Sequence, residues 1–264
     1  MPTALAAATL IFSVDVDAGY PASDLAGLRQ VDLAAGRLMD IFRRRQLRAT
    51  WGLGQLAASS LARRLVDAGH EVGVLGELAW AGTGISRSRY SAELGRRVAA
   101  LVESGGRVTT LLMHQGVADV PLDLLARHGI RAVRPAPASA PRASLWRKLL
   151  GGWKRSAVGE PPMRCLRHGI WELAAGQSQP TGVSRRSLRR LARAAFNPFP
   201  LTIDVSRLAS GGEENWSAVE RVVQHAEQLR EREQVQIETV AAWLGGVSQT
   251  PLRRPARSIL RRAA

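Results

Sequence analysis

The amino-acid sequence predicts an α/β protein in which parallel strands are joined by crossover helices. Short apolar segments rich in β-branched residues alternate with segments of helical periodicity, and the alternation continues along most of the chain. Glycines stand where several of the helices should end. This alternation is typical of parallel sheets, in which a helix connects each strand to the next. Periodicity alone leaves open whether the sheet closes into a barrel or stays an open, doubly wound sheet.

The predicted elements follow one another in the order that this class requires. Strands are expected at residues 8–16, 49–53, 70–75, 107–113, 130–133, 169–173 and 200–205, with a short last strand beginning near residue 236 and leading into a final helix. The other helices are expected at residues 24–45, 55–68, 89–103, 121–128, 184–195 and 215–233. Residues 135–162 are expected to form a loop or insertion. The sequence therefore predicts one domain, residues 1–245, and a basic flexible tail, residues 246–264.

Length and composition argue against a membrane protein and against a disulfide scaffold. Hydrophobic residues make up 45% of the 264 residues, and no apolar run approaches the ~20 residues of a membrane-spanning helix. The single cysteine, Cys165, cannot form a disulfide within the chain. The apolar N-terminal segment has no basic residue before it, so we interpret it as part of the first strand and not as a signal peptide. These observations favour a cytoplasmic protein.

The chain is strongly basic. Its formal net charge is +15, and only Lys148 and Lys154 among the 37 basic residues are lysines. The basic residues cluster at 142–155, 185–193 and 253–262. These arginine clusters could bind an anionic surface such as nucleic acid or acidic lipid, whereas solvated helix faces and a mobile tail would explain them without any partner.

Two carboxylates mark a candidate site at the end of the first predicted strand. Asp15 and Asp17 are two residues apart, so their side chains point to the same face of the strand. The C-terminal ends of strands are where α/β folds place active sites. Such a pair can bind a divalent metal or divide the roles of base and ligand. Strand-end solvation or helix capping would account for the same pair without a function.

Several segments, in order, resemble motifs of the polysaccharide deacetylase family. Residues 11–17 (Ile-Phe-Ser-Val-Asp-Val-Asp) resemble its first motif, and residues 69–73 (Gly-His-Glu-Val-Gly) resemble the segment that leads into its metal motif. Weaker likenesses lie at residues 47–54, 122–130, 201–204 and 236–243. The resemblance covers roughly residues 8–245 and implies a deformed (β/α) barrel of about seven parallel strands.

The resemblance implies hydrolysis of the acetamide group of an N-acetyl sugar. Asp15 would act as the base, and Asp17 would bind a zinc-like ion together with two histidines. That ion would polarise the amide carbonyl and activate water. Asp204 stands where the family has a second catalytic group, a histidine.

The implied ligand is a glycan or an N-acylated sugar. We expect contacts to it from Trp51, Trp80, His114 and Arg134, since aromatic faces suit sugar rings and a guanidinium suits an anion. Core packing explains Trp51 without any ligand.

Departures from the family pattern remove the expected metal ligands. The family's two histidines fall at Leu75 and Ala79, neither of which can bind a metal, and the nearby Glu77 has the wrong spacing. We therefore expect no cofactor, unless Asp15, Asp17, His114 and Asp204 together rebuild a site for a divalent metal.

Three functional hypotheses remain open from the sequence. The first is a deacetylase-like protein of carbohydrate metabolism with a degenerate metal site and weak or no activity of the usual kind. The second is a non-catalytic relative that binds a glycan or a partner protein. The third is an arginine-rich binder of an anionic surface.

Overall fold

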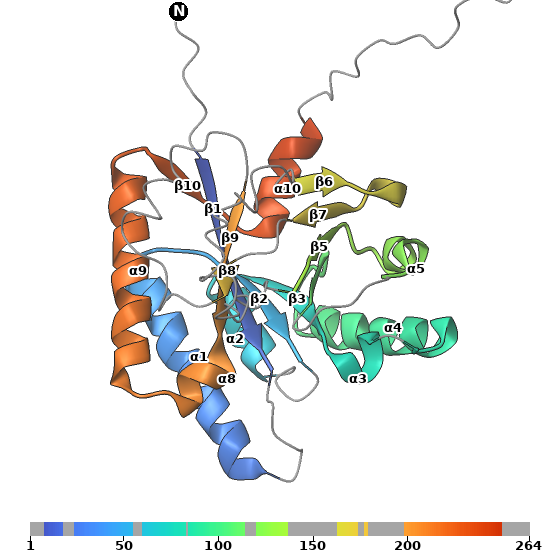
Figure 1. The fold of residues 1–264 in the computed structure, drawn as a ribbon, viewed down its shortest axis with the longest axis horizontal. Helices are drawn as coiled ribbons and strands as arrows, with labels where there is room; N and C mark the ends of the chain where they lie inside the picture. Colours follow the sequence, from blue (N-terminus) through green and yellow to red (C-terminus); the bar gives the residue numbers. More distant parts are fainter. Residues whose placement is uncertain are drawn as a thin grey trace, which may run out of the picture.

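A computed structural model describes residues 8–17, 24–54, 60–82, 84–113, 120–136, 163–173, 177–178 and 198–249. In these ranges the chain forms a curled, mostly parallel sheet with helices packed around it (Figure 1). Seven parallel strands follow one another in the order β7-β5-β4-β3-β2-β1-β9. The predicted deformed barrel is therefore confirmed.

The strands of the described residues belong to one sheet. They are β1 (Ala8–Val16), β2 (Thr50–Leu53), β3 (Glu71–Gly76), β4 (Thr110–Met113), β5 (Ala132–Arg134), β6 (Met163–Cys165), β7 (Trp171–Leu173), β8 (Gln177–Ser178), β9 (Phe199–Asp204) and β10 (Val235–Ile237). The helices are α1 (Leu25–Arg44), α2 (Ser60–Asp67), α3 (Leu78–Ala81), α4 (Arg87–Glu103), α5 (Leu122–Arg127), α8 (Val205–Ser210), α9 (Glu213–Glu231), α10 (Val240–Gln249) and the 3-10 helix η2 (Arg167–Gly169).

The differences from the predicted elements are local. The sequence did not predict β6, which pairs antiparallel with β7, or the short helices α3 and α8. Helix α10 continues beyond the predicted domain boundary at residue 245 and reaches Gln249. The predicted helix at residues 184–195 and residues 137–162 of the predicted loop lie outside the described residues.

Strand β1 lies at the centre of the sheet and separates two groups of buried side chains. It pairs in parallel with β2, β9 and β10. Phe12 and Val14 pack in the larger cluster with residues of the helices, whereas Ile11 belongs to a smaller cluster with Ala132 of β5 and Trp243 of α10. Because strand side chains alternate between faces, Ser13 and Asp15 follow Ile11 on the enclosed face of the sheet.

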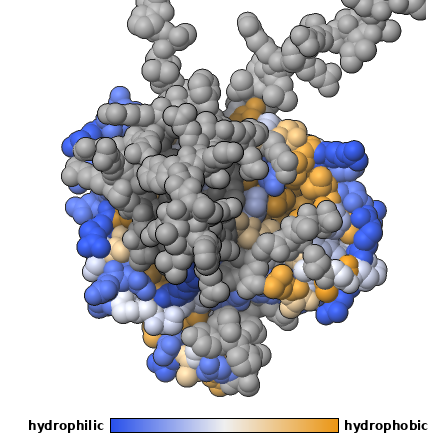
Figure 2. Space-filling view, in the orientation of Figure 1, coloured by the Kyte–Doolittle hydropathy of each residue, from blue (hydrophilic) through white to orange (hydrophobic). Residues whose placement is uncertain are grey.

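The surface of the described residues is mixed. On the face seen in Figure 2, hydrophobic surface gathers over the side where β6, β7 and α5 lie, and hydrophilic surface is prominent at the outer edges. None of the described helices combines the length and the apolar character that crossing a membrane would require.

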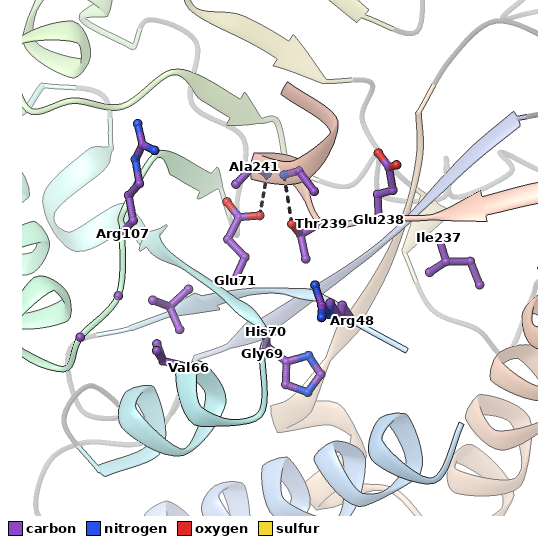
Figure 3. Close-up of a pocket in the computed structure, with 14 residues that line it drawn as sticks. Arg48, Val66, Gly69, His70, Glu71, Arg107, Ile237, Glu238, Thr239 and Ala241 are labelled. Carbon is purple, nitrogen blue, oxygen red and sulfur yellow. Dashed lines mark hydrogen bonds between the residues drawn. The ribbon is translucent and has the colours of Figure 1, made fainter. Parts of the chain in front are cut away.

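Helix α10 closes the N-terminal end of the curled sheet, and Glu71 attaches it there. The buried Glu71 carboxylate accepts hydrogen bonds from Thr50 Oγ1 (2.7 Å), Thr110 Oγ1 (2.6 Å) and Ala241 N (2.9 Å). Figure 3 shows this carboxylate directed at the first turn of α10, where a negative charge also suits the helix dipole. Burial raises the pKa of Glu71, and the donated hydrogen bonds offset part of that effect. One side chain therefore joins β2, β3, β4 and α10.

His70, directly before β3, is a second buried polar group at this end. Its ring lies 5.9 Å from Phe42 and 5.6 Å from Trp51, between ring centroids, and its Nδ1 accepts a hydrogen bond from Ala49 N (3.1 Å). Burial lowers the pKa of His70 to about 4, and the charge of Arg48 acts in the same direction. The folded protein therefore holds this imidazole neutral.

Replacing Glu71 with alanine should lower the free energy of unfolding by about 3 kcal/mol, because two buried hydroxyls and a helix N–H lose their acceptor. Urea denaturation monitored by circular dichroism measures the loss. Glu103→Ala, at an exposed position near the end of α4, is the matched control and should change stability by at most about 0.5 kcal/mol. Equal losses in the two variants would contradict the role assigned to Glu71.

Acid should destabilise the protein through His70. The unfolded chain, with a histidine pKa of 6.5, binds a proton that the fold rejects until about pH 4, so this contribution is complete above pH 6.5 and is lost as the pH falls toward 4. Between about pH 7.5 and about pH 5 we expect a loss of about 2 kcal/mol from this residue. Denaturant titrations at both pH values should show a smaller loss in His70→Gln, whose amide oxygen can accept from Ala49 N. Identical losses would refute this assignment.

Candidate functional site

Acidic side chains gather where strands β1, β3 and β9 end. Asp15 of β1 is in register with Asp204 of β9, on the neighbouring strand, and the partly buried Asp17 directly follows β1. Glu77 follows β3, and its Oε1 occupies the space that a side chain at Gly54 would need. The C-terminal end of the sheet thus carries the carboxylates that the sequence singled out. Asp15, Asp204 and Glu77 are each held by a different structural partner.

Asp15 forms a buried ion pair with Arg134, which ends β5. Nη2 of Arg134 lies 2.7 Å and 2.8 Å from the two oxygens of Asp15, and Nη1 donates to Thr202 Oγ1 at 3.0 Å. The side chain of Arg134 is 0% exposed and that of Asp15 is 1% exposed. Nη2 also reaches the main-chain oxygen of Met113 at 3.2 Å. The guanidinium therefore links strands β1, β4, β5 and β9 across the enclosed face.

Asp204 caps helix α8, which begins directly after it. Its Oδ1 accepts from Ser206 N (3.0 Å), Ser206 Oγ (2.6 Å) and Arg207 N (3.3 Å). This is the arrangement of an aspartate N-cap, which satisfies amide groups that the first turn of a helix leaves without acceptors. The position predicted to carry a catalytic group therefore acts as a helix cap in this structure.

Glu77 is held by Arg97 of α4. Nη2 of Arg97 lies 2.9 Å from Glu77 Oε2, and its Nε lies 2.8 Å from Glu93 Oε1. The guanidinium also stacks over Trp80, 4.9 Å from the ring centroid. Trp80 is itself buried against Tyr90, with ring centroids 5.4 Å apart. Glu77 and Trp80 thus belong to one packed cluster between α3 and α4.

The predicted sugar-contacting residues have different placements. Trp51 is completely buried, and its ring packs against Phe42 and His70 in the core. Trp80 is buried in the Arg97 cluster. Neither ring offers a face to a sugar in this arrangement, because neighbouring side chains already cover it. His114 lies outside the described residues.

The positions of the two family histidines do not fit a zinc-like ion. Leu75 is completely buried in β3, and its Cδ1 lies with that of Leu112 over Gly52, each 3.1 Å from where a Cβ would stand there. Ala79 is exposed on α3. Within the part of the chain that the structure describes, no three His, Cys, Asp or Glu side chains converge as a metal would require. At position 75 a buried leucine stands in place of one histidine ligand, and at position 79 an exposed alanine stands in place of the other.

Comparisons with known proteins support the fold. No protein-family model matches the sequence, and none of the curated proteins matches it. Among solved structures, a putative polysaccharide deacetylase from Mycobacterium smegmatis is similar over 94% of this chain and 92% of its own, with a TM-score of 0.65 and 17% identity. A 4-α-glucanotransferase from Thermococcus litoralis matches over 90% of this chain and 40% of its own, with a TM-score of 0.64 and 12% identity.

A CE4 family pseudoenzyme from Bacillus anthracis is similar over 89% of this chain and 65% of its own, with a TM-score of 0.51 and 10% identity. A mutant of it is described as having restored enzymatic activity. At these identities the likenesses show that the chain has the polysaccharide deacetylase fold.

Two contacts at this end of the sheet were not anticipated from the sequence. Arg134 was expected to contact an anionic ligand, whereas the structure pairs it with Asp15 inside the sheet. The Glu77–Arg97 contact was not anticipated at all. The sequence did contain a signal for the Asp15–Arg134 pair. Arg134 follows Ala132 and Val133 in a buried strand, and a buried charge requires a partner of opposite sign.

Replacing Arg134 with methionine should lower the free energy of unfolding by about 3–5 kcal/mol, because the Asp15 charge stays buried without its guanidinium. Adding Asp15→Asn to Arg134→Met should recover part of that loss, since the second change removes the stranded charge. Chemical denaturation of the single and double variants gives the coupling energy directly.

The matched control is Arg207→Met, which breaks an ion pair to Asp204 whose arginine is largely exposed and should change stability by at most about 1 kcal/mol. Purely additive effects of Asp15→Asn and Arg134→Met would show that the buried pair does not couple the two strands.

Proposed function

We propose that this chain is a polysaccharide deacetylase-like protein of carbohydrate metabolism that binds a glycan or an N-acylated sugar and has weak or no metal-dependent hydrolysis. The observation that carries the proposal is the pairing of Asp15 with Arg134, beside a ligand position that is filled by the buried Leu75.

Hydrolysis by the family mechanism needs a base that reaches the reacting water. A general base must come within hydrogen-bond distance of the proton that it removes. Both oxygens of Asp15 contact Arg134 Nη2, and the side chain is 1% exposed. This placement favours a structural carboxylate over one that takes a proton from substrate-bound water.

The second argument for weak or absent hydrolysis is that most of the expected metal ligands are missing. Catalytic zinc sites usually hold their ion with about three protein ligands. Of the ligands that the family resemblance implies, Asp17 is present, while Leu75 and Ala79 replace the histidines. These residues do not support a hydrolysis that depends on a bound zinc-like ion.

The fold argues for a carbohydrate ligand. The similar structures include a putative polysaccharide deacetylase and a 4-α-glucanotransferase, so proteins of this fold act on carbohydrates by more than one reaction. The Bacillus anthracis pseudoenzyme indicates that the fold also occurs without activity. A binding role in carbohydrate metabolism agrees with both observations.

A metal site rebuilt from Asp15, Asp17, His114 and Asp204 is the competing hypothesis. Oδ1 of Asp204 accepts hydrogen bonds from the first turn of α8, and Asp15 pairs with Arg134, so two of the four groups are committed to contacts that hold the fold together. Recruiting them to a metal would release a helix cap and strand a buried guanidinium.

The purified protein should bind N-acetylated oligosaccharides with little or no release of acetate and should carry less than one equivalent of transition metal. Isothermal titration calorimetry measures binding, an acetate assay measures hydrolysis, and mass spectrometry of the metals measures occupancy. Asp17→Ala should leave the affinity for the oligosaccharide within about two-fold of the wild type, because no bound ion links Asp17 to the ligand. Stoichiometric metal together with acetate release that Asp15→Asn abolishes would overturn the proposal.

The double variant Leu75→His/Ala79→His provides a positive control for the metal measurement, since it restores two imidazoles at the family spacing. Leu78→His/Ala79→His adds the same two imidazoles at adjacent positions and is its matched control. Zinc uptake by the first variant alone would show that ligand identity limits metal binding. Melting temperatures of both variants verify that each is folded.

A further inference from the structure

We propose a second ligand site, at the N-terminal end of the sheet and away from Asp15, Asp17 and Asp204. It is the groove between η2, α10 and the loop that follows α5. The ligand is a small molecule that carries a phosphate or carboxylate group on a sugar or other ring.

The groove has the size of a small-molecule site. Its volume is about 560 Å³, within the range of cavities that bind small ligands. One wall comes from Gly129 and Ile130 after α5, another from His168 and Gly169 of η2, and a third from helix α10. It adjoins the pocket of Figure 3, with which it shares Arg107.

Main-chain hydrogen bonds fix the positions of its polar residues. The oxygen of Thr109, just before β4, accepts from Arg131 N at 2.7 Å and Ala132 N at 3.1 Å. The oxygen of Arg131, just before β5, accepts from Trp171 N at 2.8 Å at the start of β7. Thr109, Arg131 and Trp171 therefore lie near the starts of three neighbouring strands, with Trp171 in register with Ala132 and Thr110, one residue further along than the other two.

The charged residues that the structure describes in the lining of the groove are both arginines. Arg107 and Arg131 both line it and are both exposed, and none of the lining residues that the structure describes is a carboxylate. Neither guanidinium forms an ion pair with any residue that the structure describes. The adjoining pocket differs, because Glu71 and Glu238 contribute to its lining. The two carboxylates of that pocket offset its arginines, Arg48 and Arg107, so an anion is favoured more strongly in the groove beside Arg131.

Thr109 indicates a ligand independently of the two arginines. Its side chain is 8% exposed and lines the groove, yet its hydroxyl has no hydrogen-bond partner within the described ranges. Buried hydroxyls are nearly always hydrogen-bonded, because leaving one without a partner is unfavourable. Rotation about the Thr109 side chain would direct this donor at an oxygen of an anion held by the two arginines.

Trp171 gives the site an aromatic surface. The residue is partly exposed in the groove, and its ring is held by an edge-to-face contact with Trp243 of α10, with centroids 6.2 Å apart and planes at 88°. A ring fixed in this way gives the groove an apolar surface in addition to its two arginines. The ligand chemistry that matches is an anionic group joined to a ring.

Isothermal titration calorimetry of the full chain should detect binding of inorganic phosphate, glucose 6-phosphate and glucuronate but not of glucose. Arg107→Gln and Arg131→Gln should each weaken the anions about ten-fold or more. Preference for glucose 6-phosphate over glucuronate would identify the charged group as phosphate, and the reverse order would identify it as carboxylate. Trp171→Leu should weaken both sugar ligands and leave inorganic phosphate unchanged.

Two variants separate this site from a general effect of charge or stability. Arg89→Gln removes an exposed charge on α4, outside the groove, and should leave the affinity unchanged. Thr109→Val keeps the side-chain shape, so a melting temperature equal to or above that of the wild type, with weaker phosphate binding, supports the site. No binding of any anion, equal losses in Arg89→Gln and Arg131→Gln, or unchanged phosphate binding in Thr109→Val would overturn it.

Discussion

Charged groups that a curled sheet encloses have to find their partners inside it, and this constraint shapes both ends of the protein. Near the C-terminal end of the strands, Arg134 spans the interior to Asp15 and Thr202. Near the N-terminal end, Glu71 collects two threonine hydroxyls and a helix N–H. A buried charge without such contacts would favour the unfolded chain by several kcal/mol. The polar interior therefore links β5 to β1 and β9, which are not its neighbours in the sheet, and attaches the closing helix α10.

Much of the fold was predictable from the sequence, because the patterns that indicate strands and helices lie in short stretches of adjacent residues. The alternation of apolar strands and amphipathic helices is periodic, and each period follows from a few adjacent residues. Strand β6 and helix α8 were missed for a related reason, since three strand residues or six helical residues carry too little periodicity to be recognised. The extension of α10 past Gly245 was missed because two adjacent glycines usually mark a helix end.

The candidate site was less predictable because it depends on pairs that are distant in the sequence. The sequence identified Asp15, Asp17 and Asp204 correctly as groups at strand ends, but it could not assign their partners. Asp15 and Arg134 are separated by 119 positions along the chain, and only the sheet order brings them together. The aromatic residues show the same limit, because a tryptophan has the same sequence signal whether it lies in the core, as Trp51 does, or at a surface.

The cap on α8 has a consequence for the history of this protein. If an ancestor carried a histidine at position 204, as the family resemblance implies, its replacement by Asp204 gave the chain a carboxylate that holds two main-chain amides and a serine hydroxyl. An imidazole has at most one acceptor nitrogen and cannot reproduce those contacts. A reversion at this one position would therefore weaken a helix before it could restore any chemistry. In that case, selection for a stable fold would oppose the first step back.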